Sequence, residues 1–590
     1  MLLLRTVAAV VSVLLVAPPA GAAPAAPPRV PEAVGWGGAV SSVDPDASQI
    51  GIDVLRRGGN AVDAAVATAA ALGVTDPFSA GIGGGGFFVH YDAKSRRVST
   101  IDGRETAPAS ATDKLFVENG VPLPFDQAMT SGLSVGVPGT PRTWQQALRR
   151  WGTYSLRDAL RPAEELARRG FVVDSTFNAQ VSSNAARFAD FTSTSALYLP
   201  NGVPPAVGST FRNPDLANTY RELGRDLGSL YGGAVGRDLV RTVQQPPVTP
   251  GSTRNVRAGK LTVSDLAKYT APFRAPTFTT YRGLDVYGMA PPSSGGTTVG
   301  EALNILESYD LAKLSEPEYL HRFIEATKLS FADRNRWVGD PSFYDAPTRQ
   351  LLSQRFADSR SCLIKPNAVL PAPAAPGDPR NPAPCVSEGV AAPTPQDAER
   401  TTHLTVADRW GNVVAYTLTI EAEGGSGMVV PGRGFLLNNE LTDFNFVPIT
   451  PGVPDPNLPG PSKRPRSSMS PTIVLDDHGR VVLAVGSPGG ATIITTVTQV
   501  LTSRLDRKAR LVDAIASPRA SQRNSATTPA EAAFIASPAA DALRAIGHRF
   551  STNADIGAVT AIEPAGRGQW RAAAEPARRG GGAARVVHPG

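Results

Sequence analysis

The stretch AERTTHLTVADRWGNVVAYTLTI, residues 398–420, decides the fold because a doubled threonine stands where irregular chain becomes sheet. Residues 401–407 and 413–420 alternate as β-strands do, and residues 408–412 contain the Gly and Asn of a turn. If Ala407 pairs with Val413 across this turn, the antiparallel register places Thr401 opposite Thr419. Facing threonines are usually ordinary cross-strand neighbours, so the hairpin alone does not indicate chemistry.

A glycine-rich turn further along the chain is a candidate anion site. Residues 481–485 form a compact apolar strand, GSPGG at 486–490 is a turn, and residues 491–505 have a helical pattern. Gly489 and Gly490 therefore place bare backbone N–H groups before a helix N-terminus, where the helix dipole favours an oxyanion. A plain strand-to-helix turn is the alternative.

A threonine nucleophile without a histidine base needs another proton acceptor, and its own α-amine serves once the threonine is N-terminal. Cleavage of the Arg400–Thr401 bond would free that amine. Residues of about 365–398 are rich in Pro, Ala and Gly without periodicity, which predicts an exposed linker where a cut leaves the core undisturbed. The doubled threonine therefore marks a candidate cleavage junction.

The composition is globular, with 42% apolar and 19% charged residues among 590, and it supports one large catalytic body. The 58 basic and 52 acidic residues form no run of like charge, so we expect no nucleic-acid partner. The six histidines form no ligand spacing, and we expect neither a metal nor a cofactor. Apolar spacing predicts two helices within residues 44–75, divided by Gly58 and Gly59.

The N-terminus has the pattern of a signal peptide. One Arg, an apolar run over residues 6–17 and the small residues Ala20-Gly21-Ala22 predict a signal peptide at 1–22. We therefore expect a secreted, periplasmic or cell-wall-associated protein that has no membrane segment after signal removal. In such an oxidising compartment Cys362 and Cys385 should pair, closing a loop worth about 3 kcal/mol, and two free thiols are the alternative.

Two segments match known functional motifs, but the sequence that follows each one contradicts the structure that the motif requires. Residues 81–86 match the dinucleotide fingerprint G-x-G-x-x-G, but the residues that follow read as a strand instead of the required helix. Residues 132–136 match the nucleophile elbow G-x-S-x-G around Ser134, but Pro138 and Pro141 delay the next helix. Both segments are therefore predicted to be structural loops.

Short motifs follow one another along nearly the whole chain from about residue 35. They are GGNAVDA at 58–64, DGRE at 102–105, PPSSGG at 291–296, TTH at 401–403, GFLLNNE at 434–440 with Asp443, KRPRSSMSPT at 463–472 and GSPGG at 486–490. In this order and spacing they resemble the γ-glutamyltransferase (glutathione hydrolase) family of N-terminal nucleophile hydrolases.

The resemblance implies an α/β (α+β) fold, a four-layer αββα sandwich of the N-terminal nucleophile hydrolase type. The precursor would cleave itself before Thr401 into two interlocked chains, residues 23–400 and 401–590, which stay together as a heterodimer. The enzyme would be a secreted γ-glutamyltransferase with glutathione hydrolase activity. It would pass the γ-glutamyl group of small donors such as glutathione to water or to an amino acid or peptide.

The resemblance also implies roles for single residues. Thr401 would attack the γ-glutamyl carbonyl, with Thr419 hydrogen-bonding its hydroxyl and Gly489 and Gly490 stabilising the oxyanion. The substrate α-carboxylate would be bound by Arg104, Ser467 and Ser468, and the α-ammonium by Glu421, Glu440 and Asp443. At position 421 many relatives carry Asn, so the charge of Glu421 would tune the site. Considered alone, Arg104 would instead form a surface ion pair with Glu105 or Asp102.

The segment between Asp443 and Ser467 departs from some bacterial relatives. It is shorter than their lid loop, rich in proline, and has no Tyr or Trp, so we expect a partial or absent lid. Two rival functions remain open. One is a cephalosporin or glutaryl-type acylase on the same scaffold, which needs no ammonium site, so Glu440 and Asp443 argue against it. The other is an uncleaved secreted binding protein.

Overall fold

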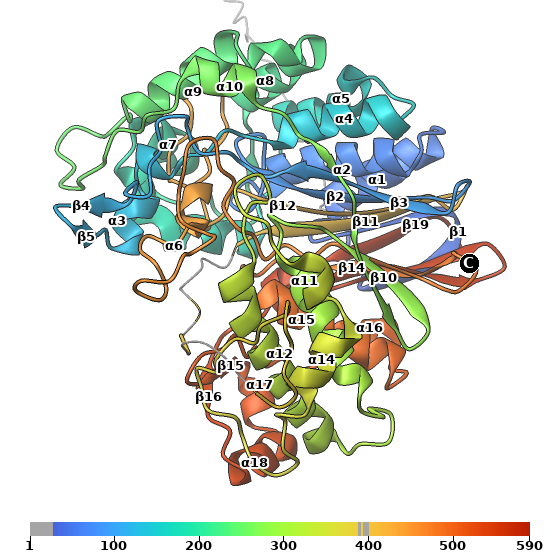
Figure 1. The fold of residues 1–590 in the computed structure, drawn as a ribbon. Helices are drawn as coiled ribbons and strands as arrows, with labels where there is room; N and C mark the ends of the chain where they lie inside the picture. The colour runs from blue at the N-terminus through green and yellow to red at the C-terminus, as the bar shows by residue number, and fades with distance from the viewer. Residues whose placement is uncertain (1–26, 387–390, 393, 395–399) are drawn as a thin grey trace, which may run out of the picture.

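The computed structural model describes residues 27–386, 391–392, 394 and 400–590 (Figure 1). The predicted signal peptide at 1–22 lies outside these residues. Within the described part, no helix is long and apolar enough to cross a membrane.

One 13-stranded antiparallel sheet runs through the molecule and is built from both sides of Thr401. Because β11 and β12, after Thr401, lie between β2 and β1, before it, a cut at this residue leaves the two parts interlocked. In spatial order the strands are β8 (Phe273–Arg274), β3 (Arg97–Gly103), β2 (Gly85–Asp92), β12 (Val413–Thr419), β11 (Thr402–Asp408), β1 (Glu32–Ser42), β18 (Gln569–Ala574), β17 (Thr560–Gly566), β14 (Val481–Gly486), β13 (Thr472–Leu475), β10 (Leu284–Gly288) and β9 (Thr277–Tyr281), and β19 (Ala583–Pro589) also pairs with β1.

Helices cover both outer faces of this curled sheet, above and below it in Figure 1. The first group is α1 (Pro45–Arg56), α2 (Ala61–Thr75), α4 (Thr140–Trp151), α5 (Leu156–Arg169), α6 (Ser175–Ala189), α7 (Thr192–Tyr198), α8 (Pro214–Arg225), α9 (Ala234–Gln244) and α10 (Val263–Lys268). The second is α11 (Gly295–Glu307), α12 (Glu316–Trp337), α14 (Gln354–Ser361), α15 (Thr492–Leu505), α16 (Leu511–Ala516), α17 (Ala532–Ile535) and α18 (Pro538–Ala545).

Three separate apolar clusters identify the layers. One joins the first helix group to β2, β11 and β12, and another joins the second group to β13 and β14. The third lies between the two halves of the sheet, where Val89 and Ala415 meet Ile473, Ala484 and Ile562. Helix, sheet, sheet and helix therefore stack in that order, and the predicted αββα sandwich is confirmed.

Local sequence signals set the elements nearest the site. The prediction of two helices divided by glycines is confirmed, since α1 ends at Arg56, Gly58 has φ of +90°, and Asn60 caps α2 in a capping box with Asp63. The hairpin register is also confirmed, with Ala407 paired to Val413 and Thr402 to Leu418. Thr401 therefore lies one residue before β11.

The described part of the linker has no helix or strand, but the prediction that it is exposed is wrong for its middle. Ala374, Pro376 and Gly377 are buried. Asn524 donates to the Ala374 carbonyl and accepts from its N–H, at 3.0 and 2.6 Å, so side-chain hydrogen bonds tie this strand-free segment to the body.

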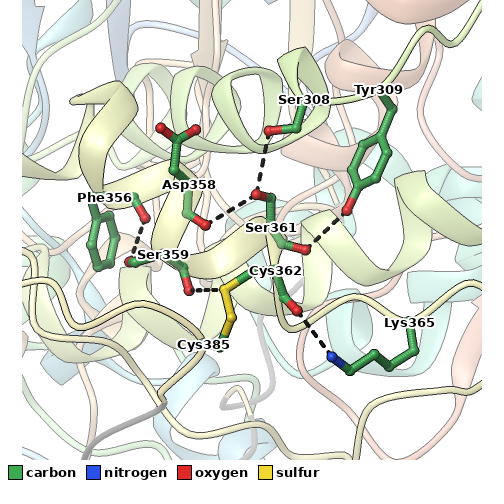
Figure 2. Close-up of a disulfide and its surroundings, with 9 residues drawn as sticks. All are labelled: Ser308, Tyr309, Phe356, Asp358, Ser359, Ser361, Cys362, Lys365 and Cys385. Carbon is green, nitrogen blue, oxygen red and sulfur yellow. Dashed lines mark hydrogen bonds between the residues drawn. A yellow bond between two sulfur atoms is a disulfide. The ribbon is translucent and has the colours of Figure 1, made fainter.

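The predicted disulfide between Cys362 and Cys385 is confirmed (Figure 2). Cys362 follows α14 directly, and the Cys385 N–H donates to the Ser359 carbonyl at 3.3 Å. The bridge therefore anchors the chain to the body fifteen residues before Arg400.

Candidate active site around Thr401

Two threonine hydroxyls converge on the peptide bond before Thr401, which is intact. Thr401 Oγ1 lies 2.6 Å from the Arg400 carbonyl oxygen and 3.3 Å from Thr419 Oγ1, and Thr419 Oγ1 donates to the same carbonyl at 3.0 Å. The Glu421 N–H donates to Thr419 Oγ1 at 2.8 Å, and Arg579 donates to the Thr401 carbonyl at 2.9 Å. These contacts fix both hydroxyls and the scissile carbonyl in one place.

Thr401 lines a cavity of about 20 Å³ that most of the predicted site residues share. A far larger cavity, about 940 Å³, lies along β8 and β9 and contains none of them, so size is a poor guide to the site. In the intact chain Arg400 itself lines the small cavity. Its lining residues are Arg400, Thr401, Thr419, Glu421, Glu440, Asp443, Arg466, Ser467, Ser468, Met469, Gly490 and Ile493.

Arg104 directly follows β3 and is 0% exposed, so the alternative of a surface ion pair is wrong. Its guanidinium donates to the carboxylates of Glu440 and Asp443. Glu105 is 3.9 Å away, while Asp102 pairs with Arg274 at 2.7 Å instead. The predicted carboxylate-binding residue and two predicted ammonium-binding residues therefore contact one another.

The charges of this cluster are strongly perturbed. Burial opposes the charge of Arg104, but the neighbouring carboxylates outweigh it and raise the pKa of its guanidinium. Burial raises the pKa of Glu440 to about 7 although Arg104 opposes the change. Burial and the charge of Glu440 raise the pKa of Glu105 well above its ordinary value. The cluster therefore carries a titratable group near neutral pH.

Ser467 and Ser468 lie in a loop that is hydrogen-bonded to other segments of the chain. Ser294 donates its N–H to the Ser467 carbonyl at 2.7 Å, and Arg334 of α12 donates to Ser468 Oγ at 2.7 Å. Asn457 donates to the Asp443 carbonyl at 2.7 Å and accepts from the Arg466 N–H at 2.8 Å. Sequence reasoning missed Arg334 and Asn457, because neither lies in a motif that signals chemistry.

Gly489 and Gly490 lie between β14 and α15, in the predicted strand-to-helix turn. Their φ values are +134° and +54°, in the region that favours glycine, and a Cβ at Gly489 would approach Thr492 Oγ1 to 2.4 Å. Among the described residues, neither N–H is paired. Gly490 lines the cavity with Thr401, whereas Gly489 is not among its lining residues.

Although the six histidines show no ligand spacing in the sequence, the fold brings His321 and His548 together beside Glu325. His321 Nδ1 lies 2.8 Å from His548 Nε2, and Glu325 stands one helical turn from His321. The protein itself engages these groups, since His321 Nε2 contacts the Lys365 carbonyl at 2.7 Å and Glu325 accepts from Lys328 at 2.7 Å. The set joins α12 to the turn after α18, across the two sides of Thr401.

Comparison with known proteins identifies the family of the chain. The glutathione hydrolase proenzyme of Bacillus subtilis (strain 168) is 38% identical over 93% of this chain and 91% of its own. The acylase ACY 1 proenzyme of Pseudomonas sp. (strain SE83) is 33% identical over 96% and 99%. The crystal structure of cephalosporin acylase from Bacillus halodurans superposes with a TM-score of 0.81 at 27% identity, over 97% and 99%. Because the gamma-glutamyltranspeptidase family profile also matches residues 47–585, the chain belongs to that family.

Proposed function

We propose that this protein is a γ-glutamyltransferase with glutathione hydrolase activity whose nucleophile is Thr401. The observation that carries this proposal is the cluster of buried Arg104 and Glu440 with half-buried Asp443, beside a hydroxyl held against a scissile carbonyl. A γ-glutamyl donor carries an α-carboxylate, an α-ammonium and, three carbons away, the carbonyl to be attacked. The guanidinium suits the carboxylate, the two carboxylates suit the ammonium, and the hydroxyl is the nucleophile for the carbonyl.

Self-cleavage would begin with attack of Thr401 Oγ1 on the Arg400 carbonyl carbon. The C–N bond breaks, the hydroxyl proton passes to the departing nitrogen, and an ester joins Arg400 to Thr401. Thr419 Oγ1, which already donates to the Arg400 carbonyl oxygen, would stabilise the negative charge on that oxygen. Water then hydrolyses the ester and leaves Thr401 with a free α-amine.

In the mature enzyme, the α-amine of Thr401 would accept the hydroxyl proton while Oγ1 attacks the γ-glutamyl carbonyl. The N–H groups of Gly489 and Gly490 would donate to the oxyanion. The leaving amine takes the proton, and the γ-glutamyl group remains as an ester on Thr401. Attack by water yields glutamate, and attack by an amino acid or peptide amine yields a new γ-glutamyl amide, so the kinetics are ping-pong.

Recognition of the donor would be an exchange of ion pairs. Without substrate, Arg104 is paired to Glu440 and Asp443. A zwitterionic donor replaces this pairing with two others, its carboxylate to Arg104 and its ammonium to Glu440 and Asp443, and no buried charge is left alone. Ser467 and Ser468 would add hydroxyl donors to the carboxylate, and Glu421, whose carboxylate accepts from Asn439, would add to the negative potential.

The same exchange separates this function from the glutaryl-type acylase. We expect γ-glutamyl-p-nitroanilide to be turned over with a kcat/KM about 100-fold above that of glutaryl-p-nitroanilide. The des-amino compound also draws Arg104 away but leaves the carboxylates uncompensated, a cost of about 3 kcal/mol. Because both compounds release p-nitroaniline, the leaving group contributes equally to the two rates. A preference for the glutaryl compound would establish the acylase instead.

Binding of a zwitterion should depend on the protonation of Glu440. Its pKa is raised to about 7, so the carboxylate is charged above that pH and neutral below it. We therefore expect the competitive inhibition constant of L-glutamate to rise as the pH falls from 8 to 6, while that of glutarate does not. Glu440→Gln should flatten the glutamate profile. If the pH dependence of the glutamate inhibition constant is unchanged in that variant, Glu440 does not bind the ammonium.

We place the mature enzyme outside the cytoplasm, in the secreted, periplasmic or wall-associated fraction. The signal-peptide pattern at residues 1–22 and the disulfide between Cys362 and Cys385 support this location. Fractionation of the producing cell, with N-terminal sequencing of the large chain, tests it.

A further inference from the structure

Glu423 lies in the segment after β12, and its carboxylate faces Arg400, the residue on the acyl side of the candidate scissile bond. Arg400 Nε and Glu423 Oε2 are 3.0 Å apart, and the two side chains are 37% and 13% exposed. Arg400 carries the carbonyl that Thr401 would attack, so a group that holds its side chain also limits where that carbonyl lies. The ion pair joins the last residue of the predicted large chain to the predicted small chain.

Helix α6 fixes the carboxylate of Glu423 in place. Ser183 Oγ donates to Glu423 Oε1 at 2.6 Å, and Asn184 Nδ2 donates to the same oxygen at 2.8 Å. Arg187, one turn further along the helix, donates to the backbone carbonyl of Glu423. One carboxylate oxygen therefore binds α6 and the other is presented to Arg400, so the partner of Arg400 is held in position by side chains of its own.

The charge of Glu423 also matters, because two cations meet at the candidate scissile bond. Arg579 donates to the Thr401 carbonyl at 2.9 Å. Burial lowers the pKa of Arg579 to about 10, the charge of Arg400 lowers it further, and the charges of Asp76 and Glu423 oppose both effects. Arg579 and Arg400, which act on the two sides of the bond, therefore repel each other. Glu423 pairs directly with Arg400 and so reduces this repulsion.

We infer that Glu423 is a positioning residue for self-cleavage, which holds the side chain of Arg400 so that the Arg400 carbonyl stays against Thr401 Oγ1. The inference rests on the proposed function. The contacts of the carbonyl itself, 2.6 Å from Thr401 Oγ1 and 3.0 Å from Thr419 Oγ1, place it in reach of the nucleophile. The ion pair increases the fraction of the precursor that has this arrangement, and thereby the rate of the cut.

Glu423 forms no bond and exchanges no proton in this reaction. In the acyl shift, Thr401 Oγ1 bonds to the Arg400 carbonyl carbon, the C–N bond breaks, and the hydroxyl proton passes to the departing nitrogen. The ester that results still carries Arg400, so the same ion pair can hold the acyl group until water hydrolyses the ester. The role is therefore confined to maturation, since Arg400 is a chain end once the cut is complete.

The test is a double-mutant cycle on the rate of self-cleavage. The full-length precursor is made by cell-free synthesis, and gel electrophoresis follows the appearance of the fragment that begins at Thr401. We expect Glu423→Gln and Arg400→Gln each to lower the first-order rate constant about tenfold, as for a partly buried ion pair that orients a reacting group. The double variant should be at most about twofold slower than Arg400→Gln, because Glu423 acts through Arg400.

Glu164→Gln is the matched control, because Glu164 forms an ion pair of similar exposure with Arg221, at 2.7 Å, and neither residue lines the cavity at Thr401. It should cleave at the wild-type rate. Arg400→Lys keeps the positive charge and should lose less of the rate than Arg400→Gln.

An unchanged rate in Glu423→Gln would overturn the positioning role. So would a tenfold loss that persists in the Arg400→Gln background, because Glu423 would then act on the structure without Arg400. A wild-type precursor that stays uncut would instead overturn the proposed self-cleavage. A cut wild type that does not turn over γ-glutamyl-p-nitroanilide would overturn the proposed activity, while the cycle still decides the role of Glu423, so the failures are distinguishable.

Discussion

Thr401→Ala is expected to remain a single uncut chain and to lose activity by at least about 10⁴-fold, because one hydroxyl serves both reactions. Thr401 Oγ1 lies 2.6 Å from the Arg400 carbonyl oxygen and Thr419 Oγ1 lies 3.0 Å from it, but only Thr401 carries both a hydroxyl and the nitrogen of the scissile bond. Mass spectrometry of the purified protein reads the cleavage, and release of p-nitroaniline from the γ-glutamyl donor reads the activity.

Thr402→Ala and Thr401→Ser are the controls for this prediction. Thr402→Ala should cleave and retain activity, because Thr402 is paired with Leu418 inside the hairpin and its removal takes away no group from the scissile bond. Thr401→Ser keeps both hydroxyl and amine and should cleave, more slowly. A Thr401→Ala protein that still yields a fragment beginning at residue 401 would remove the nucleophile assignment, and an uncut wild type would support the binding-protein alternative.

The hairpin could be predicted because its information is local. A five-residue turn with Gly411 and Asn412 fixes the register, and the register alone brings Thr401 to Thr419. The GSPGG turn is equally local, since its glycines, a strand before and a helix after are all read within 25 residues. These two segments supply both the hydroxyls and the bare amides of the candidate site.

Other features depend on contacts between distant parts of the chain, and the sequence therefore could not reveal them. Arg104 and Glu440 are paired although they lie 336 positions apart, and a spacing of this size does not indicate a contact. The linker was expected to be exposed because its composition is that of a spacer, but Asn524, 150 residues away, holds Ala374 in place. His321 and His548 meet from elements 227 residues apart.

The strand order explains why cleavage would leave the active site intact. β11 begins at Thr402, directly after the new N-terminus, and is paired on one side with β12 and on the other with β1. Arg579, near the C-terminus, donates to the Thr401 carbonyl. The pairing of β11 with strands from both sides of the cut and the contact of Arg579 would therefore keep Thr401 in position after cleavage.

Arg104→Met is expected to lower kcat/KM for the γ-glutamyl donor by about 10³-fold, mainly through KM. The variant removes the only cation that contacts both Glu440 and Asp443 among the described residues, and breaking a buried pair in this way costs about 3–5 kcal/mol. It also removes the partner of the donor carboxylate. Because Arg104 does not touch Thr401 Oγ1 or the glycine amides, kcat should change far less, and steady-state kinetics separates the two effects.

Arg104→Lys is the matched control, since it keeps the charge but loses the fork that reaches two carboxylates at once. We expect kcat/KM of Arg104→Lys for the γ-glutamyl donor to fall by about 10- to 100-fold. The thermal midpoint of Arg104→Met adds a readout without substrate. Without the cation that opposes the shift, the pKa of Glu440 in the folded state rises further, so stability present at low pH is lost as the pH rises. The variant should therefore lie closer to wild type at pH 5 than at pH 8, and the opposite trend, or an unchanged KM, would contradict this role of Arg104.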